Sequence, residues 1–271
     1  MNFPISRKIF SIFKKGSTTF FYSSLFFPND VRKNVFDLYA FVRVVDDFVD
    51  VEHSPQKFYE FKNNFYSALE SRESKNEIIS NVLRLINEEG LERAWFDSFF
   101  DSMEMDLNST KYETIFDLEK YIYGSAEVIG LMMAKLMKLP YESFFYAQQL
   151  GKAYQLINFI RDIYEDLSFD RIYIPQEDLN KFNLDLKTVD LFSENFKNLI
   201  KFEVQRYRHW HEKAKKGFYY IPKNYLIPIR TSSDMFDYTA DIIEKNPSII
   251  FQKKVKPSSS KVIYAVLKNS I

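Results

Sequence analysis

The chain has 271 residues, no cysteine, and equal numbers of basic and acidic side chains, 37 of each. The absence of cysteine excludes disulfides, thiolate metal sites and cysteine nucleophiles, and the balanced charge argues against nucleic-acid binding. Aromatic residues make up 18% of the chain, with 28 Phe and 18 Tyr, which indicates a wide apolar interior, an apolar ligand or simply a Phe-rich core.

The predicted elements are helices, and no run alternates as a β-strand would. The basic, amphipathic start MNFPISRKIFSIFKKGS can skim a membrane surface, but we expect it to form the first helix. The next helix covers Asp30–Asp50, where apolar residues recur at steps of four and three. Ser54 and Pro55 are typical of an N-cap and a first helical residue, and they predict a helix to about Ser71.

Helical periodicity continues to the end of the chain, with short connections that contain Pro, Gly, Asn or Asp. Pro228 is expected to bend or shorten one of these helices. Because no Pro/Ser-rich linker and no repeat divides the chain, we expect one all-α domain over residues 1–271. The further helices are expected at Asn76–Glu89, Leu91–Asp106, Ile115–Met137, Tyr141–Asp166, Leu186–Tyr219, Tyr225–Glu244 and Ser258–Lys268.

Several other classes of protein are not supported. The apolar stretch Gly130–Leu139 is interrupted by lysines and is too short to span a membrane. His209 and His211 point to different faces of a helix and have no third ligand nearby in sequence, so we interpret them as surface or core side chains. The scattered glycines form no dinucleotide or phosphate-binding loop, and no Glu-x-x-His pair indicates a di-iron site.

Two acidic clusters are the main indication of function: Asp46-Asp47-Phe48-Val49-Asp50 and Asp162-Ile163-Tyr164-Glu165-Asp166. Each places two aspartates four positions apart on a helix that is otherwise apolar, where like charges repel and uncompensated burial is costly. Because the chain makes this arrangement twice, we expect the two clusters to hold cations between them.

Helical geometry places further polar residues on the same faces as the aspartates. At about 100° per residue, each cluster continues backwards as a polar strip. Oxygen ligands of this kind suit Mg²⁺, and nearby arginines supply charge for phosphate oxygens, so we expect a substrate with a phosphate head and a hydrocarbon tail. Gly151 indicates either close helix packing or space for a ligand chain. The strips are Tyr39, Arg43, Asp46 and Asp50 in the first helix, and Gly151, Gln155, Asn158, Asp162 and Asp166 in the second, with Arg161 and Arg171 beside it.

These segments resemble the squalene/phytoene synthase family of head-to-head isoprenyl transferases. LYAFVRVVDDFVD (38–50) is similar to the first aspartate-rich helix of that family, and YQLINFIRDIYEDLSFDRIYIPQEDL (154–179) to the second motif. GSTTFFYSSLFFP (16–28) is similar to its N-terminal substrate segment and YIYGSAEVIG (121–130) to its central helix. The matches follow the family order over roughly residues 16–180, and the likeness is faint from Asn180 onward. RIYIPQEDL (171–179) is more like phytoene synthases than squalene synthases.

The resemblance implies an all-α isoprenoid synthase fold around a central apolar cavity, and a magnesium-dependent reaction in which Mn²⁺ is an alternative ion. It implies metal ligands at Asp46, Asp50, Asn158, Asp162 and Asp166, and catalytic roles for Asp46, Asp50, Asp162, Asp166 and Tyr173. It implies substrate contacts at Gly16, Ser17, Thr18, Thr19, Tyr39, Arg43, Tyr121, Gln155, Arg161, Arg171 and Tyr238. Gly16 departs from the family pattern, in which many relatives carry a larger polar residue. Asp47 lies about 100° from Asp46 around the helix and is not expected to be a direct ligand.

The leading hypothesis is a phytoene synthase that joins two geranylgeranyl diphosphates through a cyclopropyl diphosphate. The alternatives are a dehydrosqualene or squalene synthase that uses two farnesyl diphosphates, with NADPH required only for squalene, a catalytically silent partner protein, and a plain helical scaffold. Isoprenyl diphosphates are the expected partners, with no nucleic acid. We expect a cytoplasmic monomer or homodimer, and leave open a peripheral membrane contact for release of the product.

Overall fold

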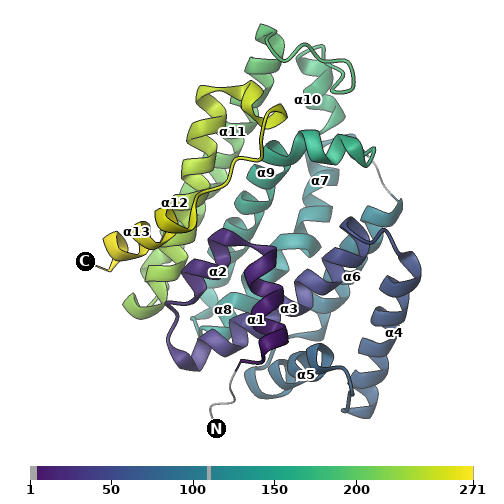
Figure 1. Cartoon of the computed structure of the whole chain (residues 1–271), viewed down its shortest axis with the longest axis vertical. Helices are drawn as coiled ribbons and strands as arrows, with labels where there is room; N and C mark the ends of the chain where they lie inside the picture. Colours follow the sequence, from purple (N-terminus) through teal and green to yellow (C-terminus); the bar gives the residue numbers. More distant parts are fainter. Residues whose placement is uncertain (1–4, 109–110, 271) are drawn as a thin grey trace.

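The computed structural model describes residues 5–108 and 111–270, and it is built from helices (Figure 1). Within these residues there is no β-strand, and a single isolated bridge joins Lys111 to Ile172. The all-α prediction is therefore confirmed. The α-helices are α1 (Arg7–Gly16), α2 (Thr18–Ser24), α3 (Asn29–Asp50), α4 (Pro55–Ser71), α5 (Glu77–Glu89), α6 (Arg93–Asn108), α7 (Ile115–Ile122), α8 (Val128–Leu136), α9 (Phe144–Ser168), α10 (Gln176–Lys181), α11 (Glu194–Lys215), α12 (Lys223–Lys245) and α13 (Ser259–Asn269). Shorter turns are η1 (Tyr123–Glu127), η2 (Tyr141–Ser143), η3 (Lys216–Tyr220) and η4 (Pro247–Phe251).

Local capping explains where most of these helices begin. The hydroxyl of Ser54 accepts the backbone N–H of Lys57, and Pro55 is the first residue of α4, as the sequence predicted. The Asn76 side chain caps α5 in the same way, and Ser258 caps α13. The short helices α2 and α10 were not predicted as separate elements.

One predicted helix start was wrong, and of the two effects expected of Pro228 one is not observed. The helix expected from Leu186 begins at Glu194, because Asp185 and Asp190 turn the preceding chain by accepting the backbone N–H groups of Lys187 and Phe192. Pro228 does not shorten its helix: α12 continues through it, since a proline early in a helix removes a single intrahelical hydrogen bond. A bend at Pro228 stays a prediction.

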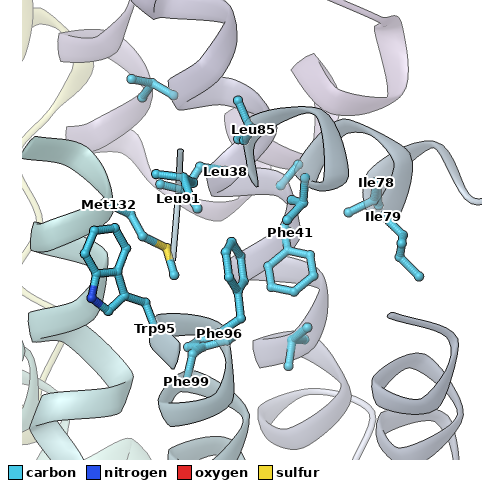
Figure 2. Packing of buried hydrophobic residues seen from close by; sticks show 14 of the residues in the cluster. Leu38, Phe41, Ile78, Ile79, Leu85, Leu91, Trp95, Phe96, Phe99 and Met132 are labelled. Atoms are coloured by element: carbon cyan, nitrogen blue, oxygen red, sulfur yellow. The ribbon is translucent and has the colours of Figure 1, made fainter. Parts of the chain in front are cut away.

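The first of two large apolar clusters packs α1, α3, α4, α5 and α6 around the ring of Phe41. This ring lies 5.4–6.1 Å from five other phenylalanine rings on α4 and α6. Figure 2 shows Phe41, Phe96 and Phe99 converging with Leu38 and Met132 at the centre of this cluster. Much of the high phenylalanine content is therefore explained by the core itself.

The second cluster packs α7, α9, α11 and α12 together, and three glycines bring the helices around it into close contact. A Cβ atom at Gly151 of α9 would overlap the carbonyl oxygen of Ala126 in η1, and Gly124 and Gly130 meet neighbouring carbonyls in the same way. Close packing, rather than room for a ligand, therefore accounts for Gly151. The size of a central apolar cavity stays a prediction.

The helix that was expected over Ile115–Met137 is interrupted by η1, a single π-helical turn. In this turn the N–H of Val128 donates to the oxygen of Tyr123, five residues earlier. The hydroxyl of Ser102 on α6 donates to the carbonyl oxygen of Tyr121 at 2.9 Å, in the turn before the π insertion. The insertion thus sets the rotation of α7, which carries Tyr121.

His211 belongs to a buried polar network between α11 and α12, as the core interpretation of this residue predicted. Its Nδ1 lies 2.8 Å from Asp237 and its Nε2 lies 2.7 Å from the hydroxyl of Ser233. Lys215 donates to the second oxygen of Asp237 at 2.9 Å. Burial raises the pKa of Asp237, but His211 and Lys215 outweigh this effect and lower it to about 2.

Candidate active site

The first polar strip lies on α3 and is held by its own arginine. Arg43 donates to Asp46 at 2.9 Å and pairs with Asp47 at 2.5 Å. Both carboxylates are partly accessible, with 31% and 35% of the side chain exposed. Burial and the charge of Asp50 raise the pKa of Asp46 well above its ordinary value, although Arg43 opposes this. The two aspartates of the strip therefore repel each other, as their spacing predicted.

Gly16 places the end of α1 directly against this strip. A Cβ atom at this position would collide with the hydroxyl of Tyr39 and press on Arg43, so Tyr39 fills the space that a larger residue would need. The ring of Tyr39 also stacks on Phe13 at 3.7 Å. The departure from the family pattern at Gly16 thus has a steric explanation in this chain.

The residues after Gly16 begin α2. Ser17 is the N-cap, and its hydroxyl accepts the backbone N–H of Phe20 at 3.2 Å. Thr18 and Thr19 form the first turn of α2 and are half-buried. The predicted substrate segment is therefore a helix N-terminus whose backbone N–H groups are suited to anions, next to Tyr39 and Arg43.

The second polar strip lies on α9. Arg161 holds Asp162 in a bidentate pair, with bonds of 2.8 and 2.5 Å. Burial and the charges of Asp162 and Asp50 raise the pKa of Asp166 to about 8. Gln155 and Asn158 are half-buried, and neither amide makes a hydrogen bond to another described residue.

Arg171 connects the two strips. Its guanidinium pairs with Asp50 and donates to the carbonyl oxygen of Val49 at 3.4 Å, both at the end of α3, although Arg171 follows α9. The backbone N–H of Arg171 donates to the carbonyl oxygen of Asp166 at 2.9 Å, so the same residue also contacts the end of α9. The prediction that residues near 46–50 and 158–166 meet is therefore supported through Arg171, whose side chain pairs with Asp50 and whose backbone N–H bonds to Asp166.

A buried carboxylate that sequence reasoning missed lies behind this junction. Asp106 at the end of α6 accepts hydrogen bonds from Tyr121 at 2.5 Å and from Tyr173 at 2.8 Å. Burial and the charge of Asp50 raise its pKa to about 7, against the effect of the two hydroxyls. The ring of Tyr173 is stacked on Phe159 at 4.2 Å. Asp106 thus fixes both predicted tyrosines, and its position at the end of a predicted helix gave no sign of this role.

Two lysines near the C-terminal end were also missed, because the family likeness is faint after residue 180. Lys254 lies 3.3 Å from Asp162 and pairs with Glu165. Burial, together with the positive charges of Lys254 and Arg161, lowers the pKa of Lys256. Three cationic side chains therefore converge on the second acidic cluster.

None of these contacts joins Tyr238 to the other predicted site residues. Its ring lies under the ammonium group of Lys261, 4.1 Å from the ring centroid, between α12 and α13. A substrate role for Tyr238 stays a prediction.

The two polar strips carry the oxygen donors expected of a magnesium site, but these donors are not gathered at one point. Among the described residues, no three acidic or histidine side chains are gathered closely enough to hold a metal ion. Instead, Arg43, Arg161 and Arg171 each neutralise one strip aspartate. The chemistry of the site still fits a hard cation, because its donor atoms are oxygens and because burial, together with the charges of Asp162 and Asp50, raises the pKa of Asp166 to about 8.

Comparisons with known proteins agree with this geometry. The family model described as squalene/phytoene synthase matches residues 13–261. A 15-cis-phytoene synthase of Synechocystis is 25% identical over 97% of this chain and 82% of its own length. Another 15-cis-phytoene synthase, from Synechococcus elongatus, is 27% identical over 87% of this chain and 82% of its own length.

Solved structures show the same fold. A dehydrosqualene synthase in complex with a ligand superposes with a TM-score of 0.89 at 22% identity, covering 96% of this chain and 93% of its own. The squalene synthase HpnC from Alicyclobacillus acidocaldarius gives a TM-score of 0.78 at 21% identity, and the superposition covers 87% of this chain and 91% of that one. The fold is therefore that of the isoprenoid synthases. With the family model covering most of its length, this chain belongs to the squalene/phytoene synthase family and is a prenyltransferase.

Proposed function

We propose that this enzyme is a magnesium-dependent phytoene synthase that joins two geranylgeranyl diphosphates. The observation that carries the proposal is the junction at Arg171, which brings the acidic end of α3 to the acidic end of α9. Curated relatives named phytoene synthase, at 25–27% identity, favour the C20 substrate. The dehydrosqualene synthase, with its TM-score of 0.89, keeps the C15 alternative in consideration.

In the first half-reaction the C1–O bond of one allylic diphosphate breaks and the diphosphate leaves with the bonding electrons. The double bond of the second molecule attacks the allylic cation, and loss of a proton closes a cyclopropane ring. In the second half-reaction that cyclopropyl diphosphate ionises and rearranges. A second proton is then lost, which gives the hydrocarbon and two diphosphates in total without a reductant.

The residues of the site are suited to each step of this reaction. Asp46, Asp50, Asn158, Asp162 and Asp166 would hold magnesium, which supplies positive charge to the leaving diphosphate. Arg43, Arg161 and the backbone N–H groups at the start of α2 would bind diphosphate oxygens once the carboxylates bind metal.

Aromatic and apolar side chains behind the acidic end would keep water from the cations. The rings of Phe159, Tyr173 and Tyr121 form a buried aromatic group there. The ring centroid of Tyr173 lies 4.2 Å from that of Phe159 and 5.5 Å from that of Tyr121. Aromatic faces stabilise carbocations. The hydroxyls of Tyr121 and Tyr173 are fixed by Asp106, so they keep a constant orientation beside the reacting chain.

The test is incubation of the purified protein with C15 or C20 diphosphate, with magnesium and with or without NADPH, followed by analysis of the hydrocarbon. We expect phytoene from the C20 substrate, independent of NADPH. A product from the C15 substrate alone would overturn the phytoene assignment, and NADPH dependence would identify a squalene synthase. A catalytically silent partner protein would give no product with either substrate, although every predicted aspartate is present in this chain.

A further inference from the structure

Although the net charge of the chain is zero, its basic and acidic residues are distributed unevenly along the sequence. Residues 1–29 contain four basic side chains and no acidic one, and residues 246–271 contain five basic side chains and no acidic one. All 37 acidic residues therefore lie in residues 30–245, together with the remaining 28 basic ones. The two ends of the chain are strongly basic, and the middle is acidic.

The fold brings the two basic ends together. Helix α2 packs against both α1 and α13, and Figure 1 shows it between them. Phe21 of α2 meets Phe10 of α1 at 5.1 Å, and Tyr22 of α2 packs on Val262 and Ala265 of α13. Helices α1 and α13, one from each acid-free segment, thus lie on either side of α2, although they stand at opposite ends of the sequence.

The basic side chains of this region face solvent. Lys254 and Lys256 turn toward the acidic cluster of the active site and are set aside. The other seven are exposed, and none forms an ion pair with a side-chain carboxylate of the residues described. Lys253 follows η4, which packs on α9, α11 and α12, and is also set aside. We call the six on α1 and α13 the terminal basic face: Arg7, Lys8, Lys14, Lys15, Lys261 and Lys268.

Apolar side chains are exposed among these cations. On α13, Val262, Ala265 and Val266 pack inward, while Ile263, Tyr264 and Leu267 are 39%, 69% and 59% exposed on the other side. A helix that is apolar on both sides is typical of one whose outer face meets a second apolar medium. Phe10 on α1 and Phe26 after α2 are also 40% and 43% exposed.

We propose that the terminal basic face and the exposed apolar side chains of α13 dock this protein on an anionic lipid bilayer. Amphipathic helices with lysines beside Tyr, Leu and Ile bind the headgroup region, where the cations meet anionic lipids and the apolar side chains enter the acyl boundary. The acidic remainder of the chain is repelled by the same lipids, which orients the molecule with α1 and α13 toward the membrane.

A soluble polyanion such as nucleic acid would account for the cations but not for the exposed Ile263 and Leu267. The bilayer accounts for both. The docking surface goes beyond the proposed reaction, and it would place the junction of α1 and α2, beside the active site, near the membrane. A hydrocarbon product would then have a short path into lipid.

The test measures binding of the full chain to sedimented vesicles, without any substrate, so it does not depend on the prenyl-transfer chemistry. We expect binding to phosphatidylcholine vesicles that contain phosphatidylglycerol and little binding to phosphatidylcholine alone. The triple variant Lys8→Gln/Lys14→Gln/Lys268→Gln should lose about a hundredfold in affinity, or about fivefold per charge. High salt should weaken wild-type binding in the same way.

The matched control is Lys75→Gln/Lys138→Gln/Lys201→Gln, which removes three exposed lysines away from this face. An equal loss in the control would overturn the proposal, because binding would then follow total charge alone. The variant Ile263→Ser/Leu267→Ser should weaken vesicle binding and leave heparin binding unchanged. Wild-type vesicle binding by this variant, or tighter binding of duplex DNA than of anionic vesicles, would also overturn it.

Discussion

Asp46 and Asp47 offer a matched test of the candidate metal site, because they are adjacent residues of one type with one shared partner. Both pair with Arg43, at 2.9 and 2.5 Å, and their side chains are 31% and 35% exposed. They differ in direction, since a helix turns about 100° between them: Asp46 lies about 40° from Asp50 and about 20° from Tyr39, whereas Asp47 lies about 60° and about 80° from these two residues. We therefore compare Asp46→Asn with Asp47→Asn.

The expected effects on stability are small and similar. Each change removes a partly exposed ion pair worth roughly 0.2–1 kcal/mol. Asp46→Asn also removes a repulsion with Asp50 of about 0.2–0.5 kcal/mol, which offsets part of that loss. Both variants should therefore unfold within about 4 °C of the wild type and keep its helical circular-dichroism signal.

The expected effects on turnover differ strongly. A carboxylate that helps to place positive charge on the leaving diphosphate contributes on the order of 2.7–4 kcal/mol to the barrier, so Asp46→Asn should lower kcat by about 10²–10³-fold. Asp47→Asn should stay within a few-fold of the wild type. Steady-state assays with C20 diphosphate over a range of magnesium concentrations measure both. Equal losses in the two variants, or a near-normal rate for Asp46→Asn, would refute the assignment of Asp46.

Three further predictions concern packing, pH and the C-terminal lysines. Gly151→Ala should lower the melting temperature by a few degrees, since overlap with the carbonyl of Ala126 costs about 1–3 kcal/mol and outweighs a helix-propensity gain of about 1 kcal/mol; a more stable variant would contradict the close packing. Because the folded-state pKa of Asp237 is depressed to about 2, its contribution of about 2 kcal/mol should be present above pH of about 4 and lost as the pH falls toward 2. The free energy of unfolding, measured with urea between about pH 2 and pH 4, should depend less on pH in Asp237→Asn than in the wild type. The same pH dependence in both proteins would disprove the stabilising role of Asp237 with His211 and Lys215. Lys254→Gln should raise KM for the diphosphate substrate about tenfold and change kcat less, because Lys254 lies beside Asp162. The control variant Lys253→Gln, at the exposed neighbouring lysine, should keep the wild-type KM. If the two variants have the same KM, Lys254 does not belong to the substrate site.

Elements with strong local signals were predicted well from sequence. The Ser54–Pro55 start of α4, the range of α3 and the ranges of α5 and α13 agree with the structure to within two residues. The error at Leu186 has a local cause, because aspartate side chains in that segment accept backbone N–H groups and compete with the helix. Periodicity alone cannot show which of these two hydrogen-bonding patterns is favoured.

The candidate site was predictable where its residues repeat along one helix face. The strips on α3 and α9 follow from the helical period, and their junction at Arg171 agrees with that expectation. Asp106 and Lys254 were not predictable in this way, because each reaches the site from an element whose position depends on tertiary packing. Their sequence neighbourhoods carry no repeated spacing that would distinguish them from ordinary surface charges.

The π-turn between α7 and α8 has a consequence for how sequences of this kind can vary. Removing one residue from 123–127 would restore a regular helix and rotate everything before it by about 100° relative to everything after it. Tyr121 would swing away from Asp106, and their hydrogen bond would be lost. A change of one residue in length at this turn would therefore turn the whole buried face of α7, with Leu118, Tyr121 and Ile122, away from its present partners.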